Sequence, residues 1–226
     1  MADFYDTSGW NEKLSLQTKG VRNKCIITNP KNDCDYYFKT SIKKGEKDYK
    51  SEFWSEIIAS KIGKILGFNI LKYDIALHNE EIGCISKSMI NNGECLIEGI
   101  SLLTGYDNTY KPDSKKSYSL YTFQFITMLE SFINRGVAEI RWNNTENKLK
   151  HFKLIKKIKE KYPEKVRETI KNILSKYIEQ EIENIVYQID IKLPDIYKKD
   201  FGLSDERKKL ICIILKERIT RLKQLE

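Results

Sequence analysis

SEFWSEIIASKIGKILGF, residues Ser51 to Phe68, is the stretch that decides the fold. Its apolar residues recur at intervals of three and four, which places them in one stripe along a helix. Ser51 is predicted to cap the amino end, and Gly67 to end the helix in a left-handed turn. The stretch therefore predicts an amphipathic helix that packs one side on another layer. The stripe consists of Phe53, Trp54, Ile57, Ile58, Ile62, Ile65 and Leu66.

Segments on both sides of this helix have the pattern of β-strands. The order strand, strand, helix, strand, strand predicts an antiparallel sheet with one packed helix, an arrangement of the α+β class. We expect a sheet of five strands or fewer, and we find no clear pattern before about Leu16. The expected strands are Cys25–Thr28 and Tyr36–Lys39, joined by a turn at 29–33, and Asn69–Ala76 and Ile82–Ile90, joined by a turn at 78–81.

The remainder of the chain is predicted to be mainly helical. A polar stretch, Tyr106 to Lys116, marks the expected boundary between a first lobe of residues 1–105 and a helical lobe of residues 106–226. The apolar stripes predict a largely buried helix at 118–133, a helix from Lys148 that ends near Tyr162-Pro163, and a helical stretch at 166–189 that allows one internal break. Ser204 is expected to cap a last helix.

Composition limits the functional classes. With 226 residues, 40% of them hydrophobic, the chain can bury the core of one domain or two packed lobes. No apolar run of about 18 residues predicts a membrane span, and the first residues lack the features of a signal peptide. Five scattered cysteines without a Cys-x-x-Cys pair, and only two histidines, predict reduced thiols, a cytoplasmic protein and no zinc site.

The formal net charge of +8 has two interpretations. It can reflect a lysine-rich, solvated surface, or it can serve an anionic partner such as a nucleotide or a nucleic acid. The lysine density is highest from Lys148 to Lys171, but four glutamates interleave with these lysines. This mixture of signs disfavours a dedicated nucleic-acid surface.

Several ordered pieces of the sequence resemble the HipA-like serine/threonine kinases of bacterial toxin–antitoxin modules. The resemblance covers about four fifths of the chain and implies a kinase-like small lobe followed by a mainly helical lobe. The pieces are Gly20-x-Arg22-x-Lys24, Tyr37-Phe38-Lys39, Ser51-Glu52-x-x-x-Glu56-Ile57-x-Ala59, Leu66-Gly67-Phe68, Gly83 to Ile90, and the tail from His151-Phe152 through Gly202-Leu203-Ser204 to Ile211.

The resemblance implies roles for individual residues. Lys39 would bind the α- and β-phosphates of ATP, and Glu56 would orient Lys39 through an ion pair. Gly20, Arg22 and Lys24 would belong to the loop over the phosphates, and Lys87, Ser88 and Met89 to the hinge that meets the adenine. Each residue also has an ordinary interpretation: Lys39 is one of 40 basic residues, Glu56 can be a surface glutamate balanced by a lysine such as Lys61, and Met89 can be a core residue.

The sequence departs from the family where catalysis would take place. Neither the Asp-Arg-His-x-x-Asn loop nor the later metal-binding Asp-Asn-Gly motif is present, and about 30 residues between Ser117 and Lys148 are too few for a helix and both motifs. We therefore assign no catalytic and no metal-binding residue, and magnesium binding is not expected. The chain is interpreted as an internally shortened, degenerate kinase that binds adenine nucleotide. The alternatives are a non-enzymatic helical module that regulates by engaging a protein or nucleic-acid partner, and a remnant without activity.

Overall fold

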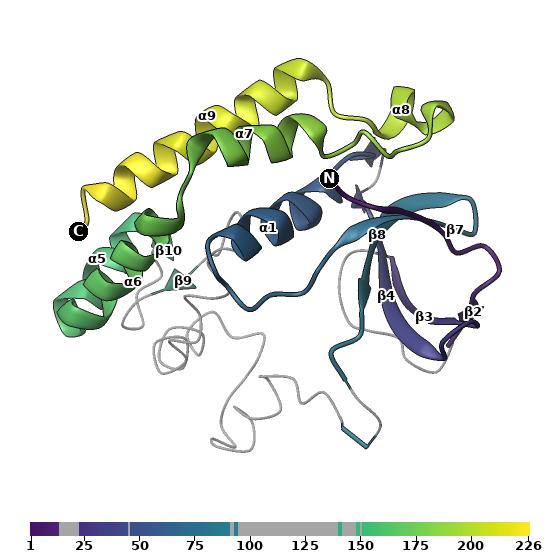
Figure 1. Ribbon diagram of the computed structural model, residues 1–226, viewed down its shortest axis with the longest axis horizontal. Helices are drawn as coiled ribbons and strands as arrows, with labels where there is room; N and C mark the ends of the chain where they lie inside the picture. Colours follow the sequence, from purple (N-terminus) through teal and green to yellow (C-terminus); the bar gives the residue numbers. More distant parts are fainter. Residues whose placement is uncertain (14–22, 45, 91–92, 95–139, 142–147, 150) are drawn as a thin grey trace. The chain divides into compact units, whose positions relative to one another are not determined.

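The computed structural model describes residues 1–13, 23–44, 46–90, 93–94, 140–141, 148–149 and 151–226 (Figure 1). The chain forms two compact units. The first consists of Met1–Met89 and Lys176–Ile219, and the second of Ile90–Ser175 and Thr220–Glu226. The expected boundary stretch at 106–116 and the expected helix at 118–133 lie outside the described residues.

The first unit is built around a curled sheet of six strands in the order β1-β7-β8-β4-β3-β2 (Figure 1). All neighbouring strands pair antiparallel except β1 and β7, which are parallel. The predicted α+β class is confirmed, but the expectation of five strands or fewer is wrong. The strands are β1 (Phe4–Asp6), β2 (Asn11–Glu12), β3 (Lys24–Asn29), β4 (Cys34–Thr40), β7 (Asp74–His78) and β8 (Glu81–Lys87).

The first twelve residues contribute a strand to each edge of this sheet. β1 pairs with β7, and after a turn β2 pairs with β3 at the opposite edge. In this turn the amide of Trp10 donates to the carbonyl oxygen of Thr7 at 2.9 Å. Trp10 then packs edge-on against Tyr36 of β4, with ring centroids 5.0 Å apart. The amino-terminal segment thus joins both edges of the curled sheet.

Two tight hairpins fix the register of the inner strands. In the β3–β4 hairpin, Cys25 lies opposite Phe38 and Lys24 opposite Lys39. The β7–β8 hairpin turns at Asn79 and Glu80, which have positive φ angles of 46° and 64°, the backbone of a two-residue hairpin turn. A further two-stranded hairpin contains β5 (Lys43–Lys44) and β6 (Lys47–Asp48).

The strand expected at 69–76 begins later than predicted, at Asp74. The residues just before Asp74 instead form hydrogen bonds with the helix α1 (Trp54–Ile65). Ser60 of α1 donates to the carbonyl oxygen of Leu71 at 2.7 Å and accepts from the amide of Tyr73 at 3.0 Å. These backbone groups therefore bond to a side chain of the helix, and regular strand pairing starts only after them.

Helix α1 matches the predicted stripe, but its start was predicted wrongly. Ser51 lies in a turn, the helix begins at Trp54, and the amide of Phe53 donates to the distant Ser41 hydroxyl at 3.0 Å. Gly67 has a φ of +80°, the left-handed conformation expected at the end of the helix. The buried members of the stripe are Phe53, Trp54, Ile57, Ile58, Ile62 and Leu66.

Distant helices complete the first unit. The second helical stretch breaks at 177–178, where the sequence allowed a break, into α6 (Pro163–Lys176) and α7 (Glu179–Gln188). α7 lies along α1 (Figure 1). After α8 (Asp195–Phe201) comes α9 (Asp205–Lys223). The Ser204 hydroxyl caps α9 as expected, since it accepts from the amide of Arg207 at 3.3 Å.

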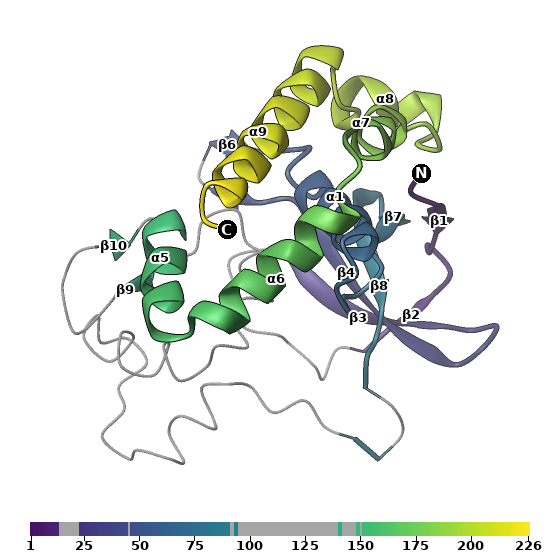
Figure 2. The ribbon, with the colours of Figure 1, turned by 60° about the vertical axis from the view of Figure 1, so that its left-hand side comes forward.

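The second unit contains α5 (His151–Lys161), most of α6 and the end of the chain (Figure 2). Ile158, Val166, Ile170 and Leu225 form its buried core. Lys148 belongs to a short strand rather than to the expected helix: β10 (Lys148–Leu149) pairs with β9 (Ile140–Arg141). No helix in the described ranges is both long enough and apolar enough to span a bilayer.

Candidate functional site: a lysine–glutamate pair between sheet and helix

Lys39 lies on an inner strand of the sheet and points toward α1. β4 is hydrogen-bonded to β8 on one side and to β3 on the other, which fixes the backbone of Lys39 firmly. Gly83 of β8 approaches this backbone so closely that a Cβ atom there would lie 2.2 Å from the carbonyl oxygen of Lys39. A glycine at position 83 is therefore required for β8 to pass beside the lysine.

Lys39 has two partners on its side of the sheet. Its Nζ lies 4.0 Å from Glu56 Oε1 of α1 and donates to the Tyr73 hydroxyl at 2.8 Å. The Nζ also lies 4.9 Å from the centre of the Tyr73 ring. The structure thus brings Lys39 and Glu56 together, as the family resemblance predicted, and adds Tyr73, which the sequence did not mark.

The charge on Lys39 is stabilised although the side chain is only 24% exposed. Burial by itself would lower the pKa of Lys39, but the Tyr73 oxygen and the Glu56 carboxylate outweigh it, so the pKa is raised above its usual value. Burial in turn raises the pKa of Tyr73, against the effect of Lys39. At neutral pH the site therefore holds an ammonium group beside a neutral phenol. An ammonium has three donors, and such a group suits an anionic oxygen.

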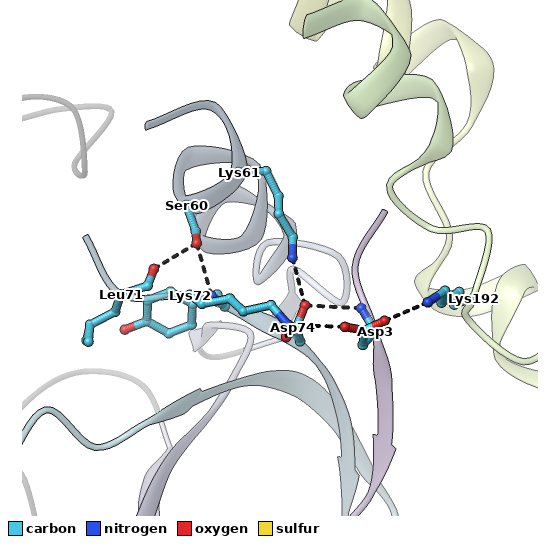
Figure 3. Close-up of polar contacts among 8 residues, drawn as sticks. Asp3, Ser60, Lys61, Leu71, Lys72, Asp74 and Lys192 are labelled. Atoms are coloured by element: carbon cyan, nitrogen blue, oxygen red, sulfur yellow. Dashed lines mark hydrogen bonds and ion pairs between the residues drawn. The ribbon is translucent and has the colours of Figure 1, made fainter. Parts of the chain in front are cut away.

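A second polar cluster holds the neighbouring part of this unit together (Figure 3). Asp74, the residue after Tyr73, accepts from Lys61 of α1 at 2.8 Å and from the amide of Asp3 at 3.1 Å. Its second oxygen lies 2.8 Å from Lys72 Nζ. Burial would raise the pKa of Asp74, but these partners lower it below its usual value. Lys61, which was one possible partner for Glu56, forms an ion pair with Asp74.

Asp3 extends this cluster to the later part of the chain. It forms ion pairs with Lys192 at 2.6 Å and with Lys72 at 3.1 Å. Hydrogen bonds from Lys192 and then Lys72 lower the pKa of Asp3 to about 2. Figure 3 shows Lys61, Asp74, Asp3 and Lys192 in succession, from α1 through the start of β7 and the residue before β1 to the loop after α7. Through Ser60 and Asp74, α1 is fixed to both sides of Tyr73, and this positions the phenol beside Lys39.

The other predicted residues are placed as follows. Lys24 lies directly opposite Lys39 in the β3–β4 ladder, half-buried. Lys87 and Met89 are exposed, and the amide of Ser88 donates to the carbonyl oxygen of Asp35 at 2.8 Å. The predicted loop residues Gly20 and Arg22 lie outside the described residues.

Comparison with known proteins supports the fold but no family. No protein-family model and no curated protein sequence matches the chain. A solved structure described as the Helicobacter pylori proinflammatory kinase CtkA is similar to this one, with a TM-score of 0.67 over 98% of each chain and 14% sequence identity. At that identity the similarity concerns the fold alone. The chain therefore has the α+β fold of a kinase-like structure, with the Lys39–Glu56 pair between its sheet and its helix.

Proposed function

We propose that this chain is a HipA-like kinase relative that binds an adenine nucleotide at Lys39 and has lost phosphoryl transfer. The observation that carries the proposal is the Lys39–Glu56 pair, with Nζ and Oε1 4.0 Å apart between the inner strand β4 and the helix α1. Kinases use such a lysine, oriented by a helix glutamate, to hold the phosphates of ATP.

The surroundings of Lys39 support an anion at this position. Lys24 lies opposite Lys39 in the neighbouring strand, so a second basic side chain belongs to this part of the sheet. Basic side chains that lie together favour the binding of an anionic group. Lys39 donates one of its three protons to Tyr73, and the remaining donors can serve Glu56 and phosphate oxygens.

The proposed loss of turnover rests on the sequence. Phosphoryl transfer depends on positioning and on metal electrostatics, and both require carboxylates that the sequence lacks in the expected motifs. Without these carboxylates, magnesium has no dedicated ligands to bridge the phosphates. We therefore propose that nucleotide binding is weak and insensitive to magnesium.

Calorimetric titration with ATP, with and without magnesium, tests binding. A charge-assisted hydrogen bond contributes about 1.5–3 kcal/mol, so Lys39→Ala is expected to weaken ATP binding about 10–100-fold. Lys50→Ala is the matched control, because Lys50 is also paired with one carboxylate, that of Asp200, but is 48% exposed. Equal affinities for Lys39→Ala and Lys50→Ala would contradict the proposed role of Lys39.

Incubation with radiolabelled ATP tests turnover, with autophosphorylation as the readout. We expect no incorporation by the wild-type chain. Robust phosphorylation that Lys39→Ala abolishes would show that another carboxylate has taken over catalysis. Glu130 and Glu139, which lie outside the described residues, would be the first to replace. That outcome would refute the loss of catalysis while supporting the nucleotide site.

A further inference from the structure

Three side chains with metal-binding atoms meet on the face of the sheet opposite Lys39. They are Glu12 of β2, Cys25 of β3 and His78 of β7, and their ligand atoms lie within 4.8 Å of one another. Cys25 is paired with Phe38 in the β3–β4 ladder, and the Phe38 ring packs edge-on against His78. Because successive strand residues point to opposite faces, Phe38 and its neighbours are separated from the Lys39 site.

The hydrogen bonds of His78 determine which ring nitrogen carries its proton. The Thr7 hydroxyl donates to the carbonyl oxygen of Leu77 at 2.8 Å, so its proton is engaged there. His78 Nδ1 lies 3.1 Å from that hydroxyl oxygen and 3.2 Å from the carbonyl oxygen of Thr7. Both of these oxygens can only accept from Nδ1, so Nδ1 must carry the proton. In the neutral ring, Nε2 then presents a lone pair.

No hydrogen-bond donor among the described residues reaches this lone pair of His78 Nε2. His78 is 3% exposed, and its Nε2 is a buried polar atom without a hydrogen-bond partner among the described residues. The Glu12 carboxylate lies 3.7 Å away and is only an acceptor when ionised. The buried His78 lone pair and the exposed Glu12 carboxylate are both acceptors, and a cation between them would serve both. A histidine whose other nitrogen donates to a backbone carbonyl is the usual arrangement of a metal ligand.

We propose that Glu12, Cys25 and His78 bind a divalent transition metal ion of the zinc type. The donor set of one thiolate, one imidazole and one carboxylate suits such an ion, and three protein ligands leave a fourth position for water. Thiolate and carboxylate together balance the two positive charges, and the thiol proton of Cys25 is released to solvent on binding.

The geometry requires only a small movement to form this site. Bonds of about 2.0–2.3 Å in a tetrahedral site place ligand atoms about 3.3–3.8 Å apart, somewhat closer than the 4.8 Å limit in the structure. Glu12 is exposed at the end of a two-residue edge strand and can provide this movement.

Zinc titration in competition with a chromophoric chelator tests the proposal, using the full chain after treatment with chelator and without a polyhistidine tag. Cobalt serves as a second probe, because a cobalt–thiolate bond gives a charge-transfer band in the near ultraviolet. Cys25→Ser removes the thiolate, and Cys34→Ser is the matched control, since Cys34 is a free thiol of the same intermediate exposure on the adjacent strand. Glu12→Gln tests the carboxylate at an exposed position.

We expect one zinc ion per chain, a cobalt–thiolate band, and release of a proton on binding. Cys25→Ser should abolish the band, and both ligand substitutions should weaken zinc binding by at least about tenfold. Cys34→Ser should bind as the wild type does. Zinc should also raise the melting temperature of the wild type but not that of Cys25→Ser. Absence of saturable binding by the wild type, or equal affinities for Cys25→Ser and Cys34→Ser, would overturn the proposal.

Discussion

Replacing Asp74 with asparagine is expected to destabilise the first unit more than any other single change in the polar cluster. The Asp74 carboxylate is 6% exposed and Lys61, its partner on α1, is 14% exposed. Asparagine keeps an oxygen that can accept from the amide of Asp3, so the change removes chiefly the charge. Removing one partner of a buried ion pair costs about 3–5 kcal/mol, because the other charge stays buried without compensation.

The exposure of the two lysines that pair with Asp74 determines where in this range the loss of stability falls. Lys72 is 56% exposed and also pairs with Asp3, so it can turn to water at a cost of at most about 1 kcal/mol. Lys61 has enough exposure to gain some hydration. We therefore expect Asp74→Asn to lower the free energy of unfolding by about 3 kcal/mol.

Urea denaturation followed by tryptophan fluorescence measures this loss, because urea, unlike guanidinium, does not screen ion pairs. Asp3→Asn is the control, since the Asp3 carboxylate is 41% exposed and is expected to cost only about 1 kcal/mol. Adding Lys61→Met to Asp74→Asn removes both buried charges and should recover part of the stability. A loss below about 1 kcal/mol for Asp74→Asn, or no recovery in the double variant, would refute the assignment of a buried ion pair.

Three other perturbations give distinct expectations. The pKa of Asp3 falls from 3.8 to about 2 on folding, so the contribution of Asp3 to the free energy of unfolding is complete above pH 4 and is lost as the pH falls from about 4 to about 2. After allowance for the exposure of Asp3, urea titrations should show that the wild type loses about 1 kcal/mol more stability than Asp3→Asn over that pH range. Gly83→Ala should lower the free energy of unfolding by about 1–3 kcal/mol and weaken ATP binding by displacing Lys39. Gly9→Ala is the control and should do neither, because a Cβ atom there meets nothing within 4 Å. Equal urea midpoints for the two variants would contradict the close approach of Gly83 to the Lys39 backbone. Ser204→Ala should cost about 1 kcal/mol through loss of the cap on α9, and a threonine at that position should restore it.

The sequence predicted well those features that depend on neighbours in the chain. The apolar stripe of α1, its end at Gly67 and the β3–β4 hairpin follow from local periodicity and turn chemistry, and all are present. The approach of Lys39 and Glu56 was predicted from a family resemblance rather than from periodicity, and the structure places the two side chains at 4.0 Å.

Features that depend on distant residues were missed. β1 and β2 are three and two residues long, too short to show any period, and their partners lie elsewhere in the chain. α1 begins at Trp54 because the amide of Phe53 donates a hydrogen bond to the Ser41 hydroxyl. The expectation of no zinc site rested on the count of two histidines and on cysteine spacing; the ligands that we propose come from three separate strands, an arrangement that spacing rules do not address.

The role of Tyr73 could have been suspected only from its position. It lies within the predicted strand at 69–76, directly before a buried aspartate, but nothing in its neighbours marks it as a partner of Lys39. The placement of Tyr73 depends on Ser60, thirteen residues earlier in the chain, whose hydroxyl accepts a hydrogen bond from the Tyr73 amide. A serine on the otherwise apolar, buried side of α1 is a local sign of such a contact, because a buried hydroxyl needs a partner.

The division of the first unit between two distant stretches of sequence affects how the chain is synthesised. Trp54 donates to the carbonyl oxygen of Phe201 at 2.6 Å, and Asp3 pairs with Lys192, so neither contact can form when the ribosome has produced only the sheet and α1. At about 5–20 residues per second, translation from Met89 to Ile219 takes on the order of ten seconds. During that interval the tryptophan side of α1 lacks its carboxyl-terminal cover, and the nascent chain presents to chaperones an apolar surface that the finished protein hides.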